Sequence, residues 1–347
     1  MNNKKTITLL AGMLLLTLTA AAQVTTPSRV EGMFMRSNFT QGTDIVVADD
    51  FADELEATLP IQWKATRGAI EVGNVGGIPC LRFANQTTAE LVNQPQLAEQ
   101  CTFEMDFFCP ADGLDFQHSI GAENAQWGHS FQLNLSTNEY HLVYRTPDDM
   151  GRSSMGQLPI QFFQVGNWNH LAISYDRHRL VAYINGKQIF EVSDCKQPST
   201  LWLSHDEWNT FHNANANAVT NIVVCNGIEP LEMQMERSSF TTRSIAFAGD
   251  TLLAPISMTV ITRLRNVMRQ QTNMKLTVEC HADLTMSDSV ALELTQRQAN
   301  AIVERLVAMG IEAERLEAKG MGNANPLANG KTPADRTRNR RVVFIKQ

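Results

Sequence analysis

The end of the chain gathers side chains that can bind anions. Residues 331–347 carry six basic groups and one acid, and Arg336, Arg340 and Arg341 lie among them. A guanidinium offers a planar fork of donors that matches a carboxylate, and each charged hydrogen bond contributes ~1.5–3 kcal/mol. These arginines are the best candidates for meeting a carboxylate, although any one arginine on a final strand more often forms a solvated ion pair.

Patterns that would support catalysis are incomplete. Glu104-Met105-Asp106 resembles the start of the E-x-D-x-x-E strand of jelly-roll glucanases, but Cys109 stands where the second glutamate belongs. A retaining glycosidase needs two carboxyl groups ~5 Å apart, and only half of such a pair is present. No serine lies in a G-x-S-x-G elbow. The sequence therefore predicts no enzyme activity and no catalytic residue, and Glu104 and Asp106 are expected on the polar face of a strand.

Two further clusters could contact a ligand. Residues 203–213 collect histidines, acids and amides beside aromatic side chains, so a loop there would hold Ca²⁺, stack a sugar on Trp208, or simply be solvated. Asp148-Asp149 directly follows Pro147 and favours a turn over a cation site. Neither cluster has the spacing of a metal motif, and no cysteine pair has zinc-type spacing. The sequence predicts no metal and no cofactor.

The first residues indicate export. Lys4 and Lys5 precede an apolar run from Ile7 to Leu18 and a small-residue stretch that ends at Ala22, which is the layout of a secretory signal peptide. The run is shorter than the ~20 residues that cross a bilayer, and no later stretch is long and apolar enough to span a membrane as a helix. We expect residues 1–22 to be removed.

Charge, length and cysteines narrow the remaining choices. The net charge of −7 becomes −9 without Lys4 and Lys5, which argues against general binding to nucleic acid or anionic membranes. The 325 residues after Ala22 suggest about two domains. Six cysteines in an oxidising compartment allow three disulfides in about fifteen connectivities, or buried thiols instead.

The first half of the mature chain has the pattern of an antiparallel β-sandwich. Residues 23–43 are polar and expected to be loose, whereas residues 44–228 contain short alternating runs separated by turn residues. In one run Phe103, Met105 and Phe107 share a face, opposite the carboxylates.

A particular sandwich family is suggested by residues 166–187. Gly166-Asn167-Trp168-Asn169-His170 opens one strand, and the next ends in Tyr183-Ile184-Asn185-Gly186. This region resembles laminin-G-like, concanavalin A-like jelly rolls, which implies the fold but says little about a ligand. Asn185-Gly186 supplies the positive backbone angles of a tight hairpin turn. Trp168 is expected to be a large buried anchor.

After residue 230 the periodicity becomes helical. An apolar stripe from Ile256 to Met268 predicts one helix, with Pro255 in its first turn, and a second helix is predicted over 289–309 with Gly310 just beyond its end. Strands are predicted at 274–280, 315–318 and 340–345. Alternating helices and strands indicate a separate α/β domain at 241–347, after a linker at 229–240.

A series of motifs in this domain carries a second resemblance. The strand 276–280 leads to His281-Ala282-Asp283, and then follow Leu294-Thr295-Gln296-Arg297-Gln298-Ala299, Lys319-Gly320-Met321-Gly322 and Arg336-Thr337-Arg338-Asn339-Arg340-Arg341-Val342. Their order and spacing resemble the OmpA-like family, which implies non-covalent binding of peptidoglycan through the zwitterionic diaminopimelate of the stem peptide. The resemblance places the ligand-binding residues at Asp283, Gln298, Arg336, Asn339, Arg340 and Arg341, with Asp283 as the carboxylate for the ammonium group.

The motif departs from the family at the position that holds the ligand carboxylate. The family arginine falls on Gln298, which can form hydrogen bonds but brings no charge. Arg297 is adjacent, but a step of one residue turns a side chain by ~100° around a helix, so it is expected to face elsewhere. Arg336, Arg340 or Arg341 would then supply the missing cation.

The sequence therefore predicts a multi-domain, non-enzymatic envelope protein located in the periplasm or associated with the outer membrane. A jelly-roll sandwich would contact glycan or an envelope protein, and the OmpA-like domain would associate with peptidoglycan. In the alternative, the jelly roll binds or processes carbohydrate, and the OmpA-like domain is a degenerate interaction module that does not bind peptidoglycan.

Overall fold

We describe the protein from a computed structural model. The structure describes residues 39–109, 116–121, 130–135, 140–146, 149–155, 163–193, 195, 198, 200–207, 217–247, 249–254 and 257–347. The predicted signal peptide and most of segment 23–43 lie outside these residues, as do Asp148, Trp208 and Pro255. Within segment 23–43, Phe39 is buried, and its ring lies 5.4 Å from that of Tyr183.

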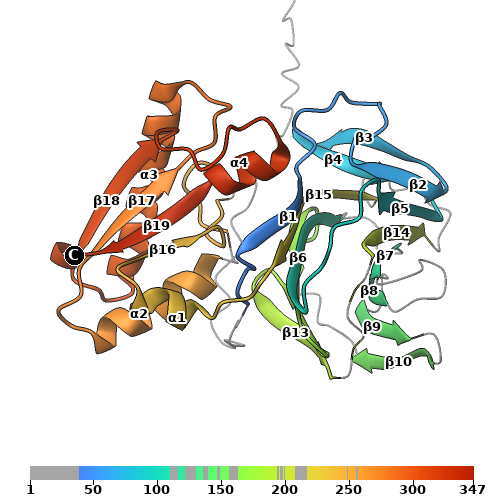
Figure 1. The fold of residues 1–347 in the computed structure, drawn as a ribbon, viewed down its shortest axis with the longest axis horizontal. Coiled ribbons are helices and arrows are strands. Elements are labelled where there is room, and N and C mark those ends of the chain that lie inside the picture. Colours follow the sequence, from blue (N-terminus) through green and yellow to red (C-terminus); the bar gives the residue numbers. More distant parts are fainter. Residues whose placement is uncertain are drawn as a thin grey trace, which may run out of the picture. The chain divides into compact units, whose positions relative to one another are not determined.

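Two antiparallel sheets make up the first part of the described chain (Figure 1). One follows the order β13-β12-β11-β6-β15-β4-β3, with β1 also paired to β15, and the other follows β10-β9-β8-β7-β14-β5-β2. The strands of the first sheet are β1 (Asp44–Asp49), β3 (Ile70–Val75), β4 (Ile78–Phe83), β6 (Gln100–Cys109), β11 (Asn167–Asp176), β12 (Arg179–Ile184), β13 (Lys187–Val192) and β15 (Ala218–Asn226). Those of the second are β2 (Trp63–Arg67), β5 (Thr87–Leu91), β7 (Phe116–Gly121), β8 (Ser130–Leu135), β9 (Tyr140–Thr146), β10 (Asp149–Met155) and β14 (Trp202–Glu207).

A single apolar cluster joins the two sheets. Phe103, Met105 and Phe107 of β6 are buried in it, together with Ala89 of β5 and Leu203 of β14. The alternation in β6 therefore has the predicted phase, because every second residue faces the apolar cluster. The jelly-roll and laminin-G-like assignment of this part stays a prediction.

The hairpin of β12 and β13 turns at the expected residues. Asn185 and Gly186 have φ values of 49° and 77°, the left-handed conformation that a two-residue hairpin turn requires. Trp168 differs from the expectation of a buried anchor. It is half-buried and packs edge-on against Phe108 at 5.6 Å, because strand alternation places it on the face opposite the buried Leu171.

The cluster at 203–213 also differs from the expected loop. Residues Trp202–Glu207 form β14, which is hydrogen-bonded on one side to β5 and on the other to β7. His205 is fully buried in this central strand. The described half of the cluster is therefore strand, because its backbone groups pair within the sheet rather than with water or a cation.

The rest of the chain, from residue 231, forms an α/β module with a four-stranded mixed sheet in the order β16-β19-β17-β18. Only the pair β17–β18 is parallel among the pairs described in this sheet. Its elements are α1 (Leu231–Glu236), β16 (Ser239–Thr242), α2 (Ser257–Gln270), β17 (Leu276–His281), α3 (Asp288–Ala308), the 3₁₀ turn η2 (Ala313–Arg315), β18 (Leu316–Gly322), α4 (Pro333–Asn339) and β19 (Arg341–Lys346). The alternation of helices and strands follows the prediction. The short α1 and the start of β16 occupy the segment predicted as linker, where four to six residues are too few to show a period.

Helices α2 and α3 pack on the sheet of the module through one apolar cluster. Leu264 of α2 and Ile302 and Leu306 of α3 are fully buried against Val278 and Phe344 of the sheet. Gly310 has φ 91° just beyond α3, which confirms the predicted stop. Within the described residues, no helix combines the length and the apolar character that a membrane crossing needs.

Helix α3 runs beside β18, the edge strand of this sheet (Figure 1), and two of its side chains bond to that strand. Thr295 Oγ1 accepts the N–H of Gly322 at 2.8 Å, and Gln296 Oε1 accepts the N–H of Gly320 at 2.8 Å. A Cβ atom at Gly320 would lie 2.4 Å from the backbone nitrogen of Gln296, so only glycine permits this approach. The polar side chains of α3 thus satisfy an edge that would otherwise lack partners.

The cysteines are buried. Cys80, Cys109, Cys225 and Cys280 are free thiols, and burial raises the pKa of Cys80 to about 11 and those of the other three to about 12. Of the two chemical states that the sequence left open, these four cysteines adopt the buried thiol.

Candidate functional site

Asp283 lies two residues beyond the end of β17, and its carboxylate is held in a fixed orientation. Oδ1 accepts hydrogen bonds from the backbone N–H of Thr285 at 2.9 Å and from its hydroxyl at 2.5 Å. These bonds leave Oδ2 directed toward Arg340, whose Nε is 3.7 Å away. The side chain of Asp283 is 6% exposed. A narrowly exposed, oriented carboxylate next to a guanidinium is an arrangement that can meet both charges of an amino acid.

Arg340 connects Asp283 to a second carboxylate. It lies between α4 and β19, and its side chain is 47% exposed. Its Nη2 donates to Oδ2 of Asp50 at 2.9 Å, while its Nε faces Asp283. Arg340 is therefore the arginine of the predicted site that the structure brings to Asp283, and it is already shared between two carboxylates.

Arg336 is buried in ion pairs with the segment after β1. It is 2% exposed, its Nη2 donates to Asp50 at 2.6 Å, and its Nη1 donates to Asp53. Burial on its own would lower the pKa of Arg336, but the hydrogen bonds of the two carboxylates outweigh it and raise the pKa. Burial likewise would raise the pKa of Asp50, yet the hydrogen bonds and charges of Arg336 and Arg340 hold it below its usual value. This guanidinium is committed to partners inside the protein.

Asn339 and Arg341 fasten the loop that precedes α4. Asn339 is fully buried, and its Oδ1 accepts the N–H groups of Leu327 and Ala328 at 2.8 and 2.9 Å. Arg341, 8% exposed, donates to the carbonyls of Asn339 and Asn325 at 3.1 and 3.0 Å. Both side chains therefore bond to backbone groups of α4 and of the loop that precedes it.

Gln298 is half-buried on α3, and its amide makes no hydrogen bond with the described residues. The adjacent Arg297 points in another direction, as predicted. Its two Nη atoms pair with Glu293 at 2.6 Å and with Asp250 at 2.7 Å. At the position of the family arginine, then, the module has a neutral side chain.

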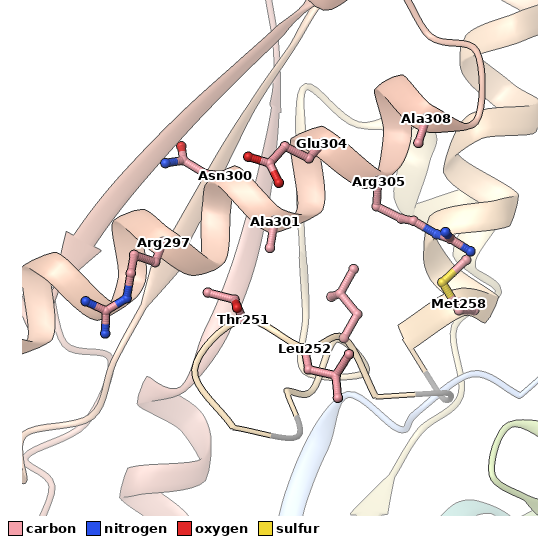
Figure 2. Close-up of a pocket in the computed structure, with 10 residues that line it drawn as sticks. Thr251, Leu252, Met258, Arg297, Asn300, Ala301, Glu304, Arg305 and Ala308 are labelled. Carbon is pink, nitrogen blue, oxygen red and sulfur yellow. The ribbon is translucent and has the colours of Figure 1, made fainter. Parts of the chain in front are cut away.

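An open depression lies on the side of α3 that carries Arg297. Figure 2 shows Ala301 pointing toward Leu252 and Arg305 toward Met258, while Glu304 points away. Its lining residues are Thr251, Leu252, Leu253, Met258, Arg297, Asn300, Ala301, Glu304, Arg305 and Ala308. None of the predicted site residues lines it, so the depression is separate from the surroundings of Asp283.

A second charged cluster was not anticipated from the sequence. On the outer face of the first sheet, His170 Nδ1 lies 2.7 Å from Asp106 and Nε2 lies 3.2 Å from Glu104. Asn221 donates to Asp106 at 2.7 Å, and Gln41 donates to Glu104 at 2.5 Å. Burial on its own would lower the pKa of His170, but hydrogen bonds and charges from the two carboxylates outweigh it and raise the pKa to about 10.

The charged groups of this cluster are already paired with one another. His170 is held protonated between Glu104 and Asp106, so each carboxylate already has a cationic partner. Strand alternation predicted the face of the two acids, but only the pairing of β6 with β11 shows that His170 lies opposite Asp106. Among the described residues, no group of histidine, cysteine and acidic side chains is arranged to hold a metal ion.

Comparison with known proteins gives a family match in the C-terminal part of the chain. Residues 247–340 match the family model described as OmpA family. The chain is similar to the peptidoglycan-binding protein ArfA of Mycobacterium tuberculosis, with 27% identity over 115 residues that cover 33% of this chain and 35% of ArfA. It is also similar to outer membrane porin F of Pseudomonas aeruginosa, with 37% identity over 83 residues that cover 24% of each chain. The chain thus spans about a third of the length of ArfA and a quarter of the porin.

Similar solved structures cover about a third of this chain. The peptidoglycan-associated lipoprotein from Burkholderia pseudomallei is 18% identical, with a TM-score of 0.29, and the match covers 33% of this chain and 93% of that chain. The match of residues 247–340 to the family model places an OmpA family domain in the C-terminal part of the chain.

Proposed function

We propose that this chain is a non-enzymatic protein of the cell envelope whose OmpA family domain associates with peptidoglycan through Asp283. The family match and the similarity to the peptidoglycan-binding protein ArfA support a peptidoglycan ligand. The observation that carries the proposal is the placement of Asp283 Oδ2 beside Arg340 Nε at 3.7 Å. Relatives named as outer-membrane proteins and lipoproteins support a location in the periplasm or at the outer membrane.

The chemistry of recognition follows from these two side chains. The Oδ2 atom of Asp283 is oriented to accept a hydrogen bond from the ammonium group of a stem-peptide diamino acid, and Arg340 would donate to its carboxylate. Thr285 contributes by holding Oδ1, so the carboxylate loses little rotational freedom when ligand arrives. The strand-rich first part would contact glycan or another envelope protein.

Retention of the intact chain on purified diaminopimelate-type peptidoglycan sacculi tests the proposal. Asp283→Ala should weaken binding by about tenfold or more, since it removes one charged hydrogen bond. Glu293→Ala is a matched control, because Glu293 is a 74% exposed carboxylate of the same module that pairs with Arg297. It should bind like wild type. Equal retention of wild type and Asp283→Ala would remove Asp283 as the site.

A second function is favoured because two positions of the predicted site, 298 and 336, offer no free positive charge to a ligand. Gln298 brings no charge, and the guanidinium of Arg336 is committed to Asp50 and Asp53. These features fit a degenerate module that contacts proteins, attached to a carbohydrate-binding or carbohydrate-processing jelly roll. Absence of sacculus retention for the intact chain would favour this function.

A further inference from the structure

Asp50 is the carboxylate that links the strand-rich part to the module. It follows β1, its side chain is 10% exposed, and both of its oxygens accept from arginines of the module. Arg336 Nη2 donates to Oδ1 at 2.6 Å, and Arg340 Nη2 donates to Oδ2 at 2.9 Å. Asp50 therefore already occupies a donor of Arg340, the guanidinium proposed to bind the carboxylate of a ligand.

The charges around Asp283 explain why this matters. Asp50, Asp53 and Asp283 face the two guanidiniums of Arg336 and Arg340, so the five groups together carry one excess negative charge. A ligand carboxylate that approached this cluster would meet repulsion and a guanidinium already bonded to Asp50. An ammonium group would meet attraction. The anionic half of a zwitterion therefore needs Arg340 to release its internal partner.

Arg336 and Arg340 differ in how easily each could release its carboxylate partner. Arg336 is 2% exposed and also holds Asp53, whereas Arg340 is 47% exposed and lies at the end of α4. If Arg340 left Asp50, Arg336 would still hold that carboxylate in place. The exchange thus breaks one charged hydrogen bond and leaves the buried ion pair intact.

We propose that Asp50 regulates the site by competing with the carboxylate of the peptidoglycan stem peptide for Arg340. This inference rests on the proposed function, because it concerns the ligand of the same site. Binding then involves exchange at Arg340, from Asp50 to the ligand, and the strand-rich part lowers the affinity of the module through one side chain.

Variants at two neighbouring carboxylates test the competition. The intact chain is titrated with a soluble muropeptide that carries a diaminopimelate tripeptide. Asp50→Asn keeps the shape of the side chain and removes its charge, so it should bind about tenfold tighter than wild type. Asp53→Asn is the matched control, because Asp53 is 52% exposed and pairs with Arg336 but not with Arg340. It should bind like wild type, and Arg340→Ala added to Asp50→Asn should remove the gain.

Two results would overturn the inference: Asp50→Asn binding no tighter than wild type, or an equal gain from Asp53→Asn. A second measurement uses the wild-type protein, so it does not require any variant to fold. During the muropeptide titration the Nε–H resonance of Arg340 should shift while that of Arg336 stays, and saturation without a shift at Arg340 would exclude the exchange. Failure of the proposed function would give a different result. Either the wild type and every variant would fail to bind the muropeptide, or Asp283→Ala would leave binding unchanged.

Discussion

The Nη2 atom of Arg336 lies 2.6 Å from Oδ1 of Asp50, although 286 positions separate the two residues in the chain. Arg336 is nearly inaccessible, and Asp50 has only a small exposed fraction. A buried pair of this kind is costly to break, because the remaining partner keeps its charge without its counter-ion. The contact therefore joins β1 to α4 and also determines which arginine remains for a ligand.

Removal of this arginine should destabilise the protein. We expect Arg336→Ala to lower the free energy of unfolding by about 3 kcal/mol, since Asp50 would lose one of its two guanidinium partners and keep Arg340. Arg340→Ala is the control and should cost about 1 kcal/mol or less, because this side chain is half exposed. Urea unfolding of the intact chain measures both. Equal losses for the two variants would contradict the different roles assigned to them.

The His170 cluster should make the free energy of unfolding fall as the pH rises from about 6.5 to 10. The pKa of His170 is raised to about 10 in the folded protein, against 6.5 ordinarily. The folded state thus binds a proton that the unfolded state loses above about pH 6.5. The stabilisation is fully present below pH 6.5 and disappears as the pH rises through 10.

A comparison with His170→Gln isolates this effect, because other titrating groups such as the buried Asp49 are common to both proteins. Wild type should unfold at a higher temperature than the variant near pH 6. The difference should shrink steadily up to pH 10. A difference that stays constant across this range would show that His170 does not carry a proton between Glu104 and Asp106.

The packing of α3 on β18 gives a third prediction. Gly320→Ala should destabilise the protein by about 1–3 kcal/mol, because its Cβ would lie 2.4 Å from the backbone of Gln296, which cannot move independently of α3. Gly73→Ala is the control. There the nearest atoms belong to the flexible end of Arg82, which can shift, so the loss should be smaller. Thermal unfolding of both variants measures the difference, and a larger loss for Gly73→Ala would contradict it.

The sequence predicted local features well and distant contacts poorly. The turn at Asn185-Gly186 and the stop at Gly310 were predicted because each depends on the backbone angles of one or two residues. The partner of Arg336 was not predicted, since it comes from a segment whose distance is set by the whole fold. His170 escaped for a similar reason, because alternation assigns a face to a side chain but not its cross-strand neighbour. Trp168 was wrongly expected to be a buried anchor. It lies three residues before Leu171 on β11, and strand alternation therefore places the two side chains on different faces of the sheet.

The candidate site was anticipated only in part. Asp283 and Arg340 were both named from the family resemblance, and the structure brings them within 3.7 Å. Arg336 was named for the same reason, yet its guanidinium is used inside the protein. A motif identifies residue types at conserved spacing, whereas the strand-rich part that supplies Asp50 lies outside the matched residues 247–340. The charge balance of the site therefore could not be read from the motif.

The neutral residue on α3 gives the last prediction. Gln298→Arg places a guanidinium at the family position, where the amide of Gln298 makes no hydrogen bond with the described residues. We expect affinity for diaminopimelate-type sacculi to rise about tenfold, because a new charged hydrogen bond to the ligand carboxylate becomes available without displacing Asp50. Asn300→Arg adds the same charge to α3, but two residues along a helix turn a side chain by ~200°, so this guanidinium would lie on another face of the helix. An equal gain from Asn300→Arg would indicate general attraction to the sacculus, and no gain from Gln298→Arg would favour a module that contacts proteins instead.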